Sequence, residues 1–144
     1  MAHVNRPNER RNELSGRITV AAPEKRTYEG ILFQSAHEME AYRGFRALEK
    51  SGAIRKLERQ VPFALYAYVP GDYDQNLVQY RSPIQKQVSK YVADFVITEL
   101  DGTVRIYDSK AWDVRKQKFV YTEMYTLKKK WMMACHPHLR IVEI

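Results

Sequence analysis

The chain has 144 residues, of which 44% are hydrophobic and 12% aromatic, so it can bury the core of one domain. These proportions exclude intrinsic disorder of the whole chain, and the single cysteine, Cys135, excludes an internal disulfide. We expect a cytoplasmic protein, because no secretory leader is recognisable and no stretch reaches the ~18–20 apolar residues of a membrane helix. The net charge of +7 is typical of many nucleic-acid-binding proteins without being specific to them.

The first 27 residues are polar and basic and show almost no apolar periodicity. They predict a flexible N-terminal arm over 1–27, ahead of a single domain over 28–144. Two readings of the arm stay open. It is either a solvated tail or a basic segment that lies on nucleic acid.

The first helix is predicted over 36–50. Ser35 and Glu38 stand in the S-x-x-E spacing of a capping box, in which the glutamate bonds back to the backbone of the serine. Glu38 lies at the edge of the apolar face of this helix, whereas Glu40 and Arg43 project toward water. Glu38 is therefore either a capping residue, a site residue, or both.

Apolar runs predict the remaining elements. Strands are predicted over 60–68, 77–81, 91–98, 104–110 and 139–144. A helix is predicted over 115–135, with a buried stripe at helical spacing formed by Val120, Met124, Leu127 and Trp131. This order predicts an α/β fold with a central sheet flanked by helices.

Two aspartates lie inside strands that are otherwise apolar. Burying an ionised carboxylate is costly unless a cation or hydrogen bonds compensate, so Asp94 and Asp108 require an explanation. With a two-residue loop at Asp101 and Gly102, the two aspartates would point to opposite faces of the sheet. With a three-residue loop over 100–102 and a left-handed Gly102, paired residue numbers sum to 202 and Asp94 lies opposite Asp108.

Two opposed carboxylates repel each other unless a cation lies between them, and a hard ion such as Mg²⁺ prefers such oxygen ligands. In the second register Lys110 shares the face of Asp108, where an ammonium could position a water or neutralise a phosphate. Asp94, Asp108 and Lys110 thus predict a site for metal-assisted phosphodiester hydrolysis. The alternative is a set of structural ion pairs that involve Lys110, Arg105 or Arg115.

The same residues resemble the PD-(D/E)xK nuclease superfamily, in which a helix that bears Glu38 would precede Asp94 and the motif Asp108-Ser-Lys110. Four segments look more closely like an uncharacterised phage and prophage family within that superfamily: 30–38, 57–60, 91–95 and 125–130. The resemblance covers 28–144. It implies a restriction-endonuclease-like core, an αβββαβ arrangement around a mixed sheet.

The resemblance also implies the roles of individual residues. Glu38, Asp94 and Asp108 would hold Mg²⁺ or Mn²⁺, Lys110 would be the catalytic lysine, and Gln60 would lie near the site. The sequence differs from the usual pattern at Asp108, where glutamate is more common, and at Ala111, where glycine often follows the lysine.

The expected function is a divalent-metal-dependent DNA endonuclease from a phage, with the four-way (Holliday) junction as substrate. Such a junction is two-fold symmetric, so we expect a homodimer. The cations predicted to contact the DNA backbone are Lys128, Lys129, Lys130 and Arg43, although the three lysines could equally form a solvated helix face. The alternatives are a non-catalytic DNA-binding or phage-assembly module on the same fold, and a nuclease that acts on RNA.

Overall fold

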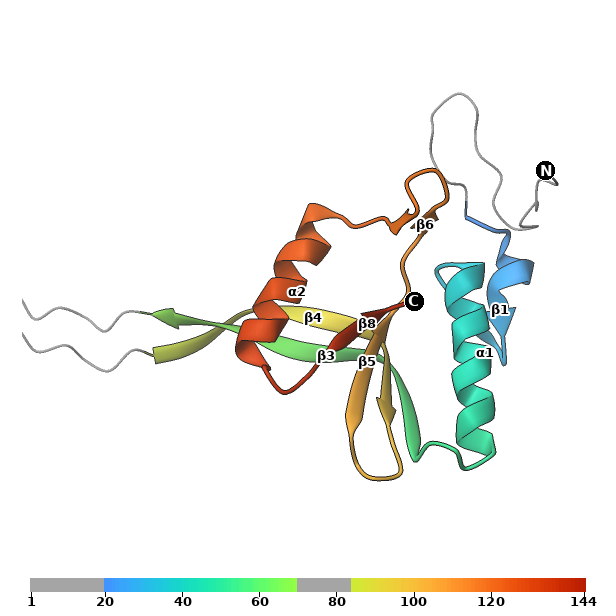
Figure 1. Cartoon of the computed structure of the whole chain (residues 1–144), viewed down its shortest axis with the longest axis horizontal. Coiled ribbons are helices and arrows are strands. Elements are labelled where there is room, and N and C mark those ends of the chain that lie inside the picture. The colour runs from blue at the N-terminus through green and yellow to red at the C-terminus, as the bar shows by residue number, and fades with distance from the viewer. Residues whose placement is uncertain (1–19, 70–83) are drawn as a thin grey trace, which may run out of the picture.

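The computed structural model describes residues 20–69 and 84–144, and its longest strands belong to one four-stranded sheet (Figure 1). The sheet has the order β3-β4-β5-β8, formed by Lys56–Val69, Ile84–Thr98, Val104–Asp108 and Ile141–Glu143. Two helices pack against it, α1 (Ala36–Lys50) and α2 (Glu123–Cys135). A 3-10 helix η1 (Pro23–Arg26) and two short hairpins complete the described part, namely β1 (Thr27–Tyr28) with β2 (Ile31–Leu32), and β6 (Trp112–Asp113) with β7 (Lys118–Phe119).

The sheet is mixed, which confirms the predicted α/β class with helices against a central sheet. Strand β4 pairs antiparallel with both β3 and β5, whereas β8 pairs parallel with β5. Within the described ranges, no helix is long and apolar enough to span a membrane.

The turn between β4 and β5 has the three-residue loop over 100–102. The N–H of Glu99 donates to the carbonyl of Thr103 at 2.8 Å, and Gly102 has the left-handed φ of 90° that favours glycine. Phe95 consequently pairs with Tyr107, a sum of 202. The register that places Asp94 opposite Asp108 is therefore confirmed, and the two-residue loop is excluded.

Each helix covers its own hydrophobic cluster. The α1 cluster contains the buried residues Phe33, Met39, Tyr42 and Phe95. The α2 cluster contains the buried residues Leu65, Tyr91, Ala93, Val96, Ile106 and Met132. Figure 1 shows α2 over one half of β3 and β4, and α1 beside the other half, where both strands have bent away.

At this bend, side chains two residues apart on β3 and β4 change from the α2 face of the sheet to the α1 face. Residues two apart in a regular strand share a face, yet Ala93 packs in the α2 cluster and Phe95 in the α1 cluster. On β3 the residue at the exchange is Gln60, whose φ of 50° lies in the left-handed region. Because Arg59 pairs with Phe95 and Val61 with Ala93, Gln60 faces Asp94 between these two pairs.

The helix predicted over 115–135 is wrong in its first third. Residues 112–119 form the β6–β7 hairpin, and α2 begins at Glu123, where the Thr122 hydroxyl accepts a hydrogen bond from the N–H of Tyr125. The predicted buried stripe is wrong at three of its four residues, since Val120 lies outside the helix and Met124 and Leu127 are more than half exposed at 60% and 55%. The fourth, Trp131, packs against the α2 cluster as predicted.

The inward face of α2 is instead rotated toward Tyr125, Lys129 and Met132, which contact the sheet residues. The predicted strand over 77–81 lies outside the described residues, as does the predicted arm up to residue 19. From Val20 onward the chain is described, and the Arg26 guanidinium donates to the carbonyls of Ala21 and Phe33.

Candidate active site

The two strand aspartates lie beside each other where β4 meets β5. The N–H of Ser109 donates to Oδ2 of Asp94 at 2.8 Å, one residue beyond Asp108 on the neighbouring strand. Burial and the adjacent Asp108 carboxylate raise the pKa of Asp94 to about 6. Excess negative charge is thus concentrated at this point of the sheet.

Asp108 is the more buried of the two, with 3% of its surface exposed. Its Oδ2 accepts a 2.7 Å hydrogen bond from the hydroxyl of Tyr91 and lies 3.1 Å from Nζ of Lys110. The Lys110 ammonium also lies 3.8 Å from the centre of the Tyr125 ring, a cation–π contact. Lys110 therefore lies on the same side as Asp108, as predicted.

Glu38 approaches this pair from the first turn of α1 and is 3% exposed. Ser35 Oγ accepts a 3.0 Å bond from the N–H of Glu38, as a capping box requires. The carboxylate accepts the N–H of Gln34 at 3.1 Å, however, which corrects the expected bond to Ser35. Burial is the main cause that raises the pKa of Glu38, and the negative charge of Asp108 adds to it.

Gln60 completes a polar row that crosses the whole sheet at one level. Its Nε2 donates to Oδ1 of Asp94 at 3.3 Å. Asp94 is followed by Asp108 on β5, and Asp108 pairs with Glu143 on β8. Each strand of the sheet thus contributes one residue to this polar row: Gln60, Asp94, Asp108 and Glu143.

Glu143 was not among the predicted site residues. It accepts a 3.0 Å hydrogen bond from the hydroxyl of Tyr125 and forms an ion pair with Lys129. Burial alone would raise the pKa of Glu143, but these two hydrogen-bond donors lower it. The sequence signal for Glu143 is weak, because a single glutamate in a short strand is usually exposed to solvent.

Arg59 was also missed. Its guanidinium carbon lies 4.5 Å from the centre of the Phe33 ring and 5.6 Å from that of Tyr42. Its positive charge lowers the pKa of Glu38 against the larger effect of burial. The buried Nε of Arg59 has no hydrogen-bond partner among the described residues.

The predicted DNA-contacting cations differ in exposure and in partners. Lys129 is turned inward to Glu143, and Lys128 is half-buried, whereas Lys130 is exposed. On α1, Arg43 is exposed and pairs with Glu40 at 3.1 Å. The alternative prediction, that the three lysines form a solvated face of α2, is therefore wrong.

The chemistry of the donor set fits a hard divalent cation, since Glu38, Asp94 and Asp108 offer oxygen ligands and two of them have raised pKa values. Their arrangement leaves each carboxylate with a different donor: Gln34 N–H, Ser109 N–H, and Tyr91 with Lys110. Within residues 20–69 and 84–144, no three acidic, histidine or cysteine side chains converge as a ready metal cage. Lys110 supplies the countercharge in this arrangement.

Residues 21–142 match a family model described as "Protein of unknown function (DUF1064)". The chain belongs to the DUF1064 family. The DUF1064 match includes the whole polar row except Glu143, together with Glu38 and Lys110. No curated protein and no solved structure matches the chain.

Proposed function

We propose that the chain is a divalent-metal-dependent DNA endonuclease with a restriction-endonuclease-like core of the PD-(D/E)xK type. The observation that supports it most is the β4–β5 register, which brings Asp94 opposite Asp108. Nζ of Lys110 lies 3.1 Å from Oδ2 of Asp108. The charge of Glu38 is close enough to interact with both Asp108 and Lys110. Three carboxylates that can hold a divalent cation, with a lysine beside them, are groups suited to metal-assisted hydrolysis of a phosphodiester.

Asp94, Asp108 and Glu38 are the residues that would hold Mg²⁺ or Mn²⁺. Such a cation, when bound, supplies a Lewis acid for a phosphoryl oxygen and lowers the pKa of a coordinated water. Hydrolysis forms a bond from the water oxygen to phosphorus and breaks the bond to the 3′ oxygen, which leaves a 5′-phosphate and a 3′-hydroxyl.

Other groups of the chain orient these carboxylates and neutralise negative charge. Tyr91 and the N–H of Ser109 fix the orientation of Asp108 and Asp94, so these carboxylates lose little freedom on binding a ligand. Lys110 carries its positive charge where a phosphate would approach, held between Asp108 and the Tyr125 ring. Gln60 orients the second oxygen of Asp94.

A non-catalytic DNA-binding module is the second candidate. The observation that favours it is the direct ion pair between Lys110 and Asp108, which neutralises the carboxylate without any metal. In that case the acidic residues would have a structural role, and the net charge of +7 would account for DNA binding.

The test uses end-labelled four-way junction, linear duplex and single-stranded DNA, each with Mg²⁺ or with excess EDTA. We expect Mg²⁺-dependent cleavage, with paired symmetric cuts in the junction if the enzyme acts as a homodimeric resolvase. Tight binding with intact DNA in every reaction would reject the endonuclease and favour the non-catalytic module.

A further inference from the structure

Four aromatic rings follow one another from the β6–β7 hairpin to Lys110. The ring centres of Trp112 and Phe119 are 5.0 Å apart, those of Phe119 and Tyr121 are 6.5 Å apart, and those of Tyr121 and Tyr125 are 5.6 Å apart. The Lys110 ammonium lies on the ring of Tyr125. We call Trp112, Phe119, Tyr121 and Tyr125 the aromatic series.

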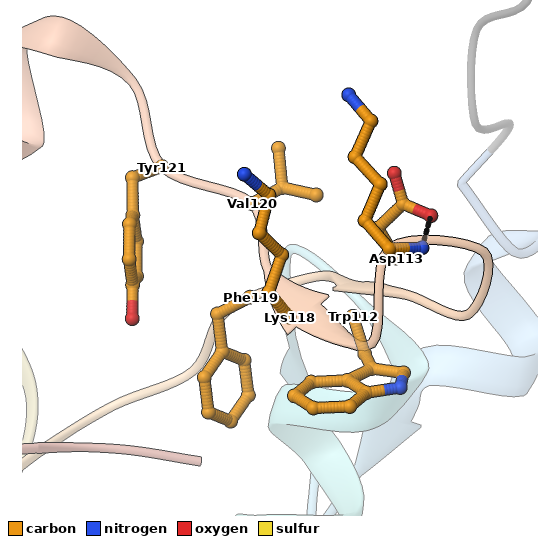
Figure 2. Close-up of a pocket in the computed structure, with 7 residues that line it drawn as sticks. Trp112, Asp113, Lys118, Phe119, Val120 and Tyr121 are labelled. Atoms are coloured by element: carbon orange, nitrogen blue, oxygen red, sulfur yellow. Dashed lines mark hydrogen bonds between the residues drawn. The ribbon is translucent and has the colours of Figure 1, made fainter.

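The local sequence explains why the series lies beside the candidate active site. The hairpin begins two residues after Lys110 and is closed at its base by the N–H of Val120, which donates to the carbonyl of Ala111 at 2.8 Å. Trp112 pairs with Phe119 across the two strands, which puts both rings on one face of the hairpin. Figure 2 shows the rings of Trp112, Phe119 and Tyr121 projecting to the same side of the chain.

Three rings of the aromatic series are not enclosed in either hydrophobic cluster, whereas the fourth, Tyr125, packs against the α2 cluster. Tyr121 is 47% exposed, Trp112 and Phe119 are half-buried, and none of the three belongs to the α1 or α2 cluster. A pocket of about 490 Å³ lies at the hairpin and is lined by Trp112, Asp113, Lys116, Lys118, Phe119, Val120 and Tyr121. Its volume is in the range of small-molecule sites, roughly 300–1,000 Å³.

The hairpin also carries positive charge. Arg115, Lys116 and Lys118 are exposed. The single acidic residue of the segment, Asp113, accepts the backbone N–H groups of Arg115 and Lys116, so its carboxylate orients the turn. Exposed aromatic rings next to Lys and Arg are the combination that binds single-stranded nucleic acid, because bases stack on the rings and the cations attract phosphates.

We propose that the aromatic series is a binding site for unpaired nucleotides of DNA. This inference rests on the proposed endonuclease function, and it names the form of the substrate: DNA with unpaired bases next to the bond that is cut. Bases within a duplex are stacked on one another and cannot offer a free face to Tyr121 or Trp112, so a fully paired duplex would not use the series. Forks and flaps expose such bases, and a four-way junction exposes them where its centre is opened.

The test measures equilibrium binding by fluorescence anisotropy in EDTA, so that no strand is cut. The probes are a single-stranded 20-mer of thymidines and a blunt duplex of similar length, the site size being on the order of that bound by small single-strand-binding domains. The variants are Tyr121→Ala and its matched control Tyr121→Phe, which keeps the ring. Lys116→Ala with Lys118→Ala serves as a charge control.

We expect Tyr121→Ala to weaken single-strand binding about tenfold and duplex binding by less than about twofold, with Tyr121→Phe close to wild type. The double lysine variant should weaken both probes alike and reduce the salt dependence of binding. Because Tyr121 is exposed, its variants should unfold at the temperature of the wild type. Equal effects of Tyr121→Ala on both probes, or no effect on either, would overturn the inference.

Failure of this inference and failure of the proposed function give different results. If Tyr121→Ala weakens single-strand binding selectively but wild-type protein cuts no DNA, the site stands and the endonuclease is rejected. If the wild type cuts DNA with Mg²⁺ and Tyr121→Ala binds both probes as the wild type does, the endonuclease stands and the site for unpaired nucleotides is rejected.

Discussion

The hydroxyl of Tyr91 donates a 2.7 Å hydrogen bond to Oδ2 of Asp108, and both residues are 3% exposed. Burial, followed by the charge of Asp108, raises the pKa of Tyr91 well above its usual value. The hydroxyl therefore stays protonated and remains a donor. Tyr91 anchors the α2 cluster with its ring and orients the candidate site with its hydroxyl.

Tyr91→Phe keeps the ring and removes this donor. We expect the free energy of unfolding to fall by about 1–2 kcal/mol, because a buried charged acceptor loses one of its partners. Urea titration measures the change. The control is Tyr121→Phe, which removes a hydroxyl from an exposed ring and should change stability by less than about 0.5 kcal/mol. Equal stability of Tyr91→Phe and wild type would contradict the role of the bond.

The raised pKa of Asp94 predicts that the stability of the metal-free chain depends on pH. Its pKa is about 6 in the folded chain against an ordinary 3.8. The folded state thus binds the proton of Asp94 more tightly than the unfolded state does, so the contribution of Asp94 to stability is greatest below about pH 4 and is lost as the pH rises through about 6. Asp94→Asn should flatten this fall and raise stability at pH 8 by about 1 kcal/mol, allowing for solvent screening.

Thermal unfolding in EDTA between pH 4 and pH 8 measures this effect. Asparagine retains an oxygen that can accept the N–H of Ser109, so the local hydrogen bond is conserved in the variant. Glu38, whose pKa is also raised, should leave part of the slope in Asp94→Asn. A variant as pH-dependent as the wild type would contradict the assignment.

Divalent cations should stabilise the folded chain. A site that binds Mg²⁺ or Mn²⁺ adds RT ln(1 + [L]/Kd), about 1.4 kcal/mol at ten times Kd, which raises the unfolding temperature by a few degrees. The rise should be absent in Asp108→Asn and in Asp94→Asn. NaCl of equal ionic strength is the control for screening. The same rise in all three proteins would show that the cation acts elsewhere.

Two variants of Gln60 separate the effect of backbone strain on stability from the effect of the side chain on activity. Its φ of 50° is unfavourable for any side chain, and glycine adopts it freely. Gln60→Gly should be about 1 kcal/mol more stable than Gln60→Ala, because both variants lose the contact with Asp94 but only glycine relieves the backbone. Both should lose activity to the same degree if the amide orients Asp94. Full activity in either variant would contradict that role.

The sequence narrowed the register of the candidate site to two alternatives, because Asp101 and Gly102 fit either a two-residue or a three-residue loop. The structure has the three-residue loop, and the pairing of Phe95 with Tyr107 follows from it. The helix α1 was predictable without such an alternative, since the Ser35 cap and the spacing to Glu38 give its first turn.

Other features depend on contacts that are distant in the sequence. The β6–β7 hairpin was missed because Val120, Met124 and Leu127 happen to follow helical spacing, while the pairing of Trp112 with Phe119 is not visible in that pattern. The left-handed Gln60 was not predictable, since the bend arises where two packed clusters meet on opposite faces of the sheet.

The most direct measurement is the single-turnover rate of four-way-junction cleavage by wild type and Asp108→Asn over a Mg²⁺ titration. We expect cleavage by the wild type that rises with Mg²⁺ and stops in EDTA. We expect a loss of at least about 10³-fold in Asp108→Asn, with unchanged junction affinity, because the variant would lose a ligand of the proposed metal. Cleavage by Asp108→Asn at the wild-type rate would contradict the assignment of the active site.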